Sequence, residues 1–248
     1  MLEPLQGAAG IIHRVDPRSR VLVATAMSVV VAMADRLDVL VAALAVALAG
    51  LAISGFSAAA ALRRLIPLNA ILAVLILLLP LTTDGATLLA VGPLNFSHEG
   101  FLLGTAIALK GNAIVLTLIV LLGTMDVVTL GHALSHLRVP GKLTHLLLFT
   151  VRYLDVLHRE YLRLRAAMKT RGFRPRMDRH TYRSFGYLVG MLLIRSLDRS
   201  ERITAAMKCR GFRGRFYLLD HFHFSWCDLP FGLVSLAVLL LLILGEWT

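Results

Sequence analysis

Two arginines are the best candidates for recognition chemistry, because the chain presents each of them in the same local sequence. Residues 166–176 read AAMKTRGFRPR and residues 205–215 read AAMKCRGFRGR, so that nine of eleven positions are identical. In each copy an arginine stands directly before a glycine, as Arg171 and Arg210. A guanidinium can form two parallel hydrogen bonds to one carboxylate. Arg171 and Arg210 are therefore predicted to bind acidic groups of a partner.

The glycines that follow these arginines predict how the arginines are held. Helices commonly end where a glycine adopts the left-handed backbone conformation. Gly172 and Gly211 would each close a helix in this way. The arginine before each glycine would then lie in the last helical turn, with its guanidinium projecting from a fixed helix end.

The other positions around each arginine are matched between the copies as well. Phe173 and Phe212 follow the glycines and offer an apolar anchor beside each arginine. The residue before each arginine is small, Thr170 in one copy and Cys209 in the other. Two matched sites indicate two equivalent receptors, as in a partner that is a dimer.

Metal chemistry is conceivable at two histidine pairs, but the other ligands are lacking. His132 and His136 are spaced i, i+4 and would share a face if the segment were helical, and His221 and His223 are two residues apart. Neither pair has a cysteine or glutamate nearby in ligand spacing, which favours surface or interfacial histidines. The two cysteines of the chain fit no metal or redox spacing either. We predict no metal site and no cofactor.

Catalytic chemistry is not indicated. The chain has no G-x-x-x-x-G-K-[ST] phosphate loop, so it is not expected to hydrolyse ATP by itself. The acids of the same region are interpreted as solvated helix residues, two of them with an arginine at i, i+4. They are Asp155, Glu160, Asp198 and Glu201. No nucleophile with a matching base is evident, and an enzyme is not favoured.

The composition indicates that these residues are carried by a membrane protein. Hydrophobic residues make up 57% of the 248 residues, whereas soluble domains are about 45–50% apolar. The apolar runs are 21–34, 39–53, 65–81, 101–125 and 229–245. The last three have the ~17–25 residues of a membrane helix, and the first two are either thin, closely packed spans or a shallow hairpin. We predict an all-α integral membrane protein with about five transmembrane helices.

The formal net charge of +11 is concentrated in one block. Residues 126–228 hold 19 basic and 8 acidic residues, whereas the loop 82–100 has no Lys or Arg. Loops rich in Lys and Arg face the cytoplasm. The protein is therefore expected in the cytoplasmic (inner) membrane, with its N-terminus on the cytoplasmic side and its C-terminus on the outer side. The predicted regions are membrane helices 1–4 in 1–125, a cytoplasmic helical region in 126–228 and a last membrane helix in 229–248.

The basic block is predicted to contain two long helices. Apolar residues recur at steps of three and four over 143–168, and Pro140-Gly141 marks the start of this helix of roughly thirty residues. A second helix is predicted over 182–210. Its apolar stretch, 185–194, is only ten residues long, which indicates burial against other helices rather than a sixth span.

Together these features resemble a known family, the transmembrane T components (EcfT family) of energy-coupling factor (ECF) ABC importers, and most closely the cobalt-transport CbiQ proteins. Residues 13–20, His-Arg-Val-Asp-Pro-Arg-Ser-Arg, are similar to the family's N-terminal leader. The two Arg-Gly-Phe copies are the more specific feature. The order of apolar runs and basic block matches along essentially the whole chain.

The resemblance implies a non-catalytic coupling subunit of an ATP-driven importer, with cobalt ions as cargo. T components join two cytoplasmic ATP-binding subunits to a membrane substrate-binding subunit, here a CbiM-like protein with or without a CbiN-like small subunit. Their two coupling helices each end in an Ala-Arg-Gly signature that docks into one ATPase subunit. Arg171 and Arg210 would be the docking arginines, and Thr170 and Cys209 replace the alanine of the signature with other small residues.

Three polar residues within the apolar runs allow two interpretations. They are Lys110, Asn112 and Asn69. A charge at the centre of a bilayer costs about 2.5–3.5 kcal/mol on insertion scales. Either Lys110 snorkels outward and the asparagines bond across packed helices, or these groups contact the substrate-binding subunit.

Other functions remain open from the sequence. T components for nickel, biotin or another vitamin look alike, because selectivity would reside in a different chain. A protein of another class, a membrane-tethered binder of nucleic acid or anionic lipid, would use the basic block as an electrostatic patch. Such a patch does not need Arg-Gly-Phe twice at helix ends. The expected partners are therefore the ATPase dimer, the substrate-binding subunit and the lipid bilayer, with no nucleic acid.

Overall fold

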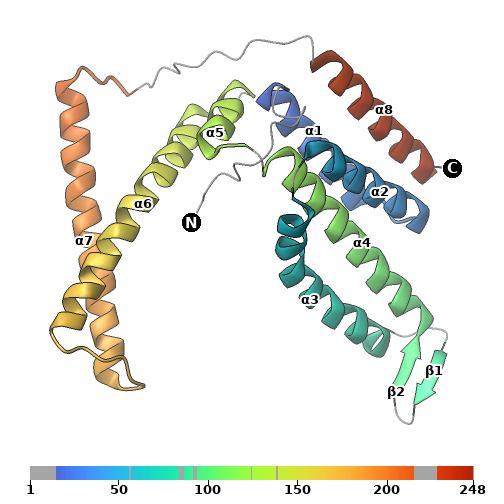
Figure 1. Ribbon diagram of the computed structural model, residues 1–248, viewed down its shortest axis with the longest axis horizontal. Helices are drawn as coiled ribbons and strands as arrows, with labels where there is room; N and C mark the ends of the chain where they lie inside the picture. Colours follow the sequence, from blue (N-terminus) through green and yellow to red (C-terminus); the bar gives the residue numbers. More distant parts are fainter. Residues whose placement is uncertain are drawn as a thin grey trace. The chain divides into compact units, whose positions relative to one another are not determined.

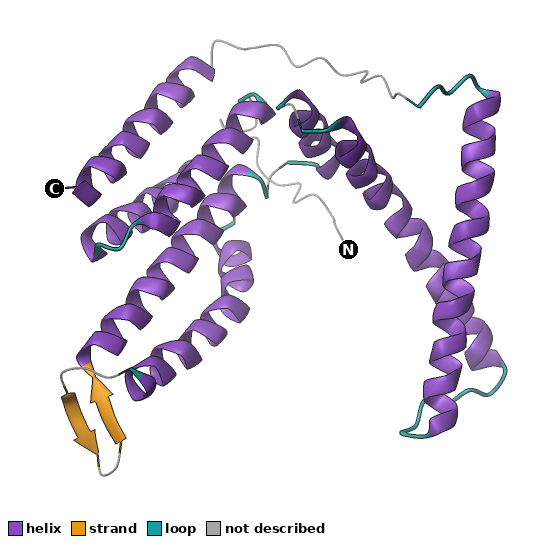
Figure 2. Cartoon of the chain, turned by 180° about the vertical axis from the view of Figure 1, so that it is seen from behind, coloured by secondary structure: helices purple, strands orange, loops and turns teal. Residues whose placement is uncertain are grey.

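The computed structural model is helical apart from one short hairpin (Figures 1 and 2). It describes residues 15–55, 57–83, 87–91, 94–123, 125–137, 139–214 and 228–247. These residues fall into two compact units. One unit holds α1 to α5, the hairpin β1–β2 and α8, and the other holds α6 and α7. The expected helical class is confirmed.

Four helices in the described part of the chain are long and apolar enough to cross a membrane. They are α2 (Leu37–Ser54), α3 (Ala58–Thr82), α4 (His98–Leu121) and α8 (Asp228–Trp247). The first predicted span forms α1 (Pro17–Met33), which has 17 residues and is about 25 Å long. A bilayer core is about 30 Å thick, so α1 is shorter than the distance that a membrane-spanning helix must cover. The protein is a multi-pass membrane protein.

The membrane unit is organised around α4, which packs against α1, α2 and α3. Small side chains allow this close approach, as they do in membrane helix pairs generally. A Cβ atom on Gly104 would lie 3.1 Å from the Cα of Ile76 on α3. The main core cluster lies between α1, α2, α4 and α8. Its buried residues are Met27, Val31, Ala34, Val39, Leu40, Ala43, Ala113 and Leu242.

The described end of the leader joins three helices of the membrane unit. The Asp16 carboxylate accepts a hydrogen bond from the Arg18 amide at 2.9 Å, which caps the N-terminus of α1. The Asp16 amide donates to Oδ1 of buried Asp228, at the start of α8, at 2.6 Å. Nη2 of buried Arg20 donates to the Leu121 carbonyl, at the end of α4, at 2.5 Å. His13 and Arg14 lie outside the described residues.

Two elements of this unit were not predicted. The strands β1 (Thr87–Val91) and β2 (Leu94–Ser97) pair antiparallel, with Val91 opposite Leu94. Helix α5 (Val127–His136) follows α4 and packs against α1. Both are short, and neither carries the long apolar or periodic run from which the other helices were recognised.

The second unit consists of two long helices that cross each other (Figures 1 and 2). Helix α6 (Gly141–Thr170) begins and ends where the sequence predicts. Helix α7 (Arg179–Cys209) begins three residues earlier than expected. With 30 and 31 residues, each helix is about 45 Å long.

Candidate docking site

The first Arg-Gly copy forms a Schellman cap at the end of α6. Gly172 has a φ of +77°, and its amide donates to the Lys169 carbonyl at 3.1 Å. The Phe173 amide donates to the Met168 carbonyl, also at 3.1 Å. These two bonds satisfy carbonyls that the helix end leaves unpaired. The expected closure of the helix by glycine is present here.

The second copy forms the same cap at the end of α7. Gly211 has a φ of +82°, and its amide donates to the Lys208 carbonyl at 3.0 Å. The Phe212 amide donates to the Met207 carbonyl at 3.0 Å. The repeat in the sequence is therefore a repeat in three dimensions. Its Met and Phe stand at the two positions whose side chains usually touch in such a cap.

The backbone, and not the available space, requires glycine at these two positions. A Cβ atom on Gly172 or Gly211 would meet no atom of the described chain within 4 Å. A positive φ, however, costs an L-residue about 1–2 kcal/mol. The caps therefore depend on glycine because of its conformation, which leaves the surface around each cap open.

Arg171 and Arg210 are the C-cap residues of α6 and α7. The sequence predicts them in the last helical turn, and the structure places them one position beyond it. Their φ values of −84° and −87° keep the chain close to helical geometry before the glycine reverses it. Both side chains are exposed. Neither guanidinium has an acidic partner among the residues that the structure describes. Each cap thus presents a cation that is available to another protein.

The residues next to the two Arg-Gly pairs differ in the contacts that they make within the chain. The Thr170 hydroxyl donates to the Ala167 carbonyl at 2.9 Å, while Cys209 is an exposed free thiol. The ring of half-buried Phe173 packs edge-on against Phe185 of α7, with centroids 5.8 Å apart. Phe173 therefore fixes the turn between the two helices in addition to standing beside Arg171.

The two caps lie at opposite ends of the crossed helices, because α6 and α7 run in opposite directions (Figure 1). The first cap follows the last residue of α6, and the second follows the last residue of α7. A short turn joins the first cap to the start of α7, so the length of α7, about 46 Å, separates the two caps. A single protein that binds both caps must span this distance, and otherwise two subunits must bind one cap each.

One acid of this unit does not behave as the sequence predicts. Glu160 was expected to be solvated, but its side chain is only 10% exposed at the crossing of α6 and α7. Its Oε1 accepts a hydrogen bond from Nη1 of Arg195 on α7, and its Oε2 lies 3.5 Å from Nη1 of Arg163. The bond from Arg195 and the positive charges nearby lower the pKa of Glu160 below its ordinary value. The prediction is wrong here because burial depends on the neighbouring helix.

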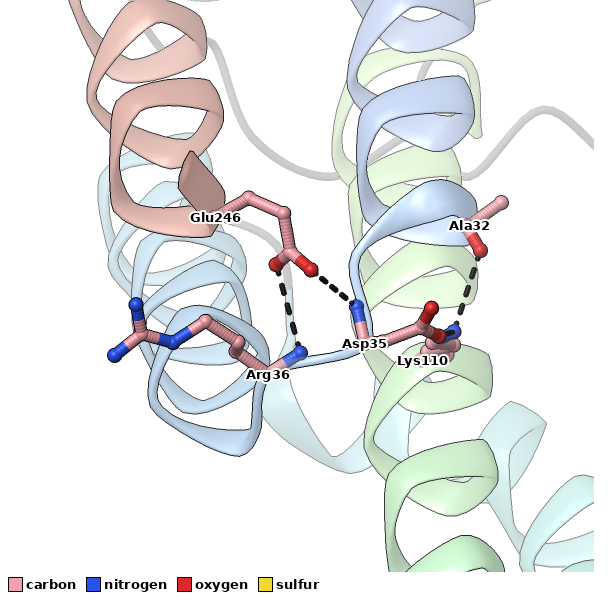
Figure 3. Close-up of polar contacts among 5 residues, drawn as sticks. All are labelled: Ala32, Asp35, Arg36, Lys110 and Glu246. Atoms are coloured by element: carbon pink, nitrogen blue, oxygen red, sulfur yellow. Dashed lines mark hydrogen bonds and ion pairs between the residues drawn. The ribbon is translucent and has the colours of Figure 1, made fainter. Parts of the chain in front are cut away.

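Lys110 finds its partners within the chain (Figure 3). Its Nζ lies 2.9 Å from Oδ1 of Asp35 and 3.3 Å from the Ala32 carbonyl, at the turn between α1 and α2. The same turn is held from α8, because Glu246 accepts hydrogen bonds from the amides of Asp35 and Arg36 at 2.9 and 3.5 Å. This geometry agrees with a lysine that snorkels towards other polar groups.

The two asparagines bond to each other between helices. Nδ2 of Asn112 on α4 donates to Oδ1 of Asn69 on α3 at 2.8 Å, and also to the Ala108 carbonyl at 2.9 Å. This is the bond across packed helices that one of the two interpretations expects. A contact of Lys110, Asn112 or Asn69 with another subunit stays a prediction.

The histidine pairs do not gather further ligands in the described residues. His132 and His136 both lie on α5. No group of three or more His, Cys, Asp or Glu side chains in the described residues is placed to hold a metal ion. His221 and His223 lie outside those residues.

The fold and the matched caps define a multi-pass helical membrane protein that presents two equivalent arginine-bearing helix ends. Residues 8–218 match a protein family described as CbiQ, cobalt transport protein. The chain belongs to this family, which supplies the transmembrane component of cobalt transport of the ECF type. A search of curated proteins finds no match to the chain.

Proposed function

We propose that this protein is the membrane coupling subunit of an ECF-type, ATP-driven cobalt importer. In this function it links two cytoplasmic ATPase subunits to a membrane substrate-binding subunit and has no catalytic role of its own. The observation that carries the proposal is the pair of identical caps at the ends of α6 and α7. Membership of the cobalt transport family supports cobalt as the cargo, rather than nickel or a vitamin.

The caps are suited to docking on a protein dimer. Arg171 and Arg210 are exposed and are held by the same backbone geometry. Each guanidinium would enter an acidic groove of one ATPase subunit and form a bidentate bond to a carboxylate there. Because the caps lie at opposite ends of the crossed helices, one ATPase subunit would take each cap.

The charge distribution supports a cytoplasmic location for the caps. The basic residues between 126 and 228 outnumber the acidic ones by eleven. Loops rich in Lys and Arg stay on the cytoplasmic side, where ATPase subunits are located. The N-terminus would then be inside and the end of α8 outside the inner membrane. On ATP binding, closure of the ATPase dimer would move the two caps and carry that movement to the membrane helices.

The substrate-binding subunit would meet the protein at exposed apolar surfaces of its membrane helices. Such surfaces are abundant on α3, where Ile71, Val74 and Leu77 are more than 60% exposed. Lys110, Asn112 and Asn69 would lie close to this contact. Because their polar groups bond within the chain, they would support the helices rather than bind cobalt.

Charge reversal at the caps tests the proposal. The protein would be co-expressed with its ATPase and substrate-binding subunits, and the complex would be purified through a tag on this chain. Arg171→Glu and Arg210→Glu should each reduce the recovered ATPase, and the double variant should lose it, together with cobalt uptake into cells. Arg165→Glu and Arg202→Glu are matched controls, because both residues are exposed on the same helices but outside the caps. Full recovery of ATPase by the double variant would contradict the proposal.

A further inference from the structure

The crossing of α6 and α7 is centred on a buried charge instead of an apolar core. All residues of α6 are described, and those that are buried are Thr144 and Glu160. Glu160 is therefore the main buried contact in the second half of α6. Its carboxylate receives Arg195 from α7, and this is the ion pair that joins the two helices among the described residues.

The apolar side chains around this pair do not close the crossing. A groove of about 310 Å³ lies between the two helices. Its walls include Tyr153 and Leu157 from α6 and Leu192, Ile203 and Met207 from α7. Closely packed interiors leave few voids larger than a water molecule. The helices are therefore loosely packed beside the ion pair, which joins them at the crossing, whereas the contact of Phe173 with Phe185 lies near the turn.

Removing the carboxylate would make the crossing repulsive. Besides Arg195, the charges of Arg163 and Arg199 act on Glu160 and lower its pKa. Arg163 lies on α6, while Arg195 and Arg199 lie on α7. Without the negative charge between them, these like charges would face each other across the crossing. A neutral residue at position 160 would thus loosen the crossing even if the helices themselves stayed folded.

The Glu160–Arg195 ion pair lies between the two caps, at some distance from each of them. Glu160 is eleven residues before Arg171, and Arg195 is fifteen residues before Arg210. Along a helix these separations are about 16 Å and about 22 Å. The part of α6 from Glu160 to its cap and the part of α7 from Arg195 to its cap are called the two arms. They point in opposite directions from the crossing (Figure 1). A rotation of one helix about the pair therefore moves its cap relative to the other.

We propose that the Glu160–Arg195 ion pair is the fulcrum that couples the movements of the two caps. The proposal rests on the proposed function and adds to it two positioning residues, which touch neither ATP nor cobalt. With the pair intact, force applied at one cap reaches the other helix through the crossing. Without it, each helix responds alone, and ATP hydrolysis continues with little transport.

The first test measures transport and hydrolysis in the same complex. Glu160→Gln and Arg195→Gln should retain ATPase subunits on purification, because the caps are unchanged. In proteoliposomes, cobalt transported per ATP hydrolysed should fall at least about fivefold, a typical size for a coupling effect. Arg165→Gln is the matched control, since Arg165 is exposed on the same helix as Glu160 and forms no ion pair among the residues that the structure describes. It should change this ratio less than twofold, within about 0.4 kcal/mol of coupling.

The charge swap Glu160→Arg with Arg195→Glu separates a fulcrum from a merely structural role. The swapped pair keeps opposite charges at the crossing and should restore most of the transport per ATP. Normal coupling in both single variants would overturn the proposal. So would a swapped protein that is as uncoupled as the single variants while its ATPase recovery is normal.

The second test is independent of transport. Spin labels at Arg165→Cys and Glu201→Cys, both exposed positions, report the distance between the two arms in a Cys209→Ser, Cys227→Ser background. The distance distribution should be narrow with Glu160 and should broaden with Glu160→Gln. An unchanged distribution would overturn the fulcrum. If the wild-type caps fail to recover ATPase while Glu160→Gln still broadens the distribution, the proposed function fails and the mechanical role of the pair stands.

Discussion

Nζ of Lys110 lies 2.9 Å from Oδ1 of Asp35, which joins the middle of α4 to the turn between α1 and α2 (Figure 3). The two residues are 75 positions apart in the chain. The Asp35 side chain is 88% exposed and the Lys110 side chain 21% exposed. The lysine thus reaches an accessible carboxylate, which explains how a charge is accommodated within an apolar run.

Replacing this lysine should have a small effect on stability. Exposed ion pairs contribute about 0–1 kcal/mol, and Asp35 remains accessible when its partner is removed. Lys110→Met should therefore change the free energy of unfolding by about 1 kcal/mol or less. Lys110→Glu should be worse, because it places a second acid beside Asp35. Thermal unfolding of the purified protein in detergent compares the two variants, and a larger loss for Met than for Glu would contradict the assignment.

The close approach of α3 and α4 should make Gly100 intolerant of a side chain. A Cβ at this position would lie 2.7 Å from the Cα of Pro80 and 2.8 Å from the Leu79 carbonyl oxygen. Gly100→Ala should destabilise the protein by about 1–3 kcal/mol, the usual cost of overpacking. Gly111→Ala is the control, since its nearest neighbour would be a flexible Leu72 methyl at 3.5 Å. Equal melting temperatures for the two variants would show that the helices are farther apart than described.

The two cap glycines should be sensitive for a different reason. Gly172→Ala and Gly211→Ala meet no neighbouring atom but must adopt a positive φ, at about 1–2 kcal/mol each. We expect the last turn of the affected helix to unwind and the recovery of ATPase to fall. Gly190→Ala, within α7 and equally free of neighbours, should instead favour the helix by up to about 1 kcal/mol. Circular dichroism and co-purification measure both effects, and identical behaviour at positions 190 and 211 would count against the caps.

The crossing of α6 and α7 should loosen in acid. Because the pKa of Glu160 is lowered from its ordinary value of 4.5 in the folded protein, its stabilising contribution is fully present above about that pH. The contribution is lost as the pH falls through the lowered pKa. The distance between spin labels on the two arms should therefore broaden below pH 4.5 in the wild type. With Glu160→Gln it should already be broad at pH 7 and should show no such transition.

Helix positions could be predicted because they depend on local properties of the chain. Apolar runs located α2, α3, α4 and α8, and the Arg-Gly copies located the ends of α6 and α7 to within a residue. The Schellman caps follow from glycine at a fixed position, which requires no knowledge of the rest of the fold.

The features that sequence reasoning missed depend on contacts between distant segments. Burial of Glu160 requires Arg195, which is 35 residues away on another helix. The partner of Lys110 lies on a turn that precedes it by 75 residues. The hairpin β1–β2 is too short to give a clear alternating pattern, and α5 too short to give a clear helical one. The one local signal is Arg163, which stands at i+3 from Glu160 on α6; it indicates an ion pair but not the burial of the carboxylate against α7.

The short first helix gives the membrane unit an uneven hydrophobic height. Helix α1 is about 25 Å long, whereas α3 is about 38 Å and α4 about 36 Å long. The turn after α1 meets α4 near its midpoint, at Lys110, so that the half of α4 before Lys110 extends beyond this turn. A bilayer adjusts to such a mismatch by thinning beside the short segment or by tilting the long ones. We therefore expect the bilayer around this protein to be thinner beside α1 than beside α3.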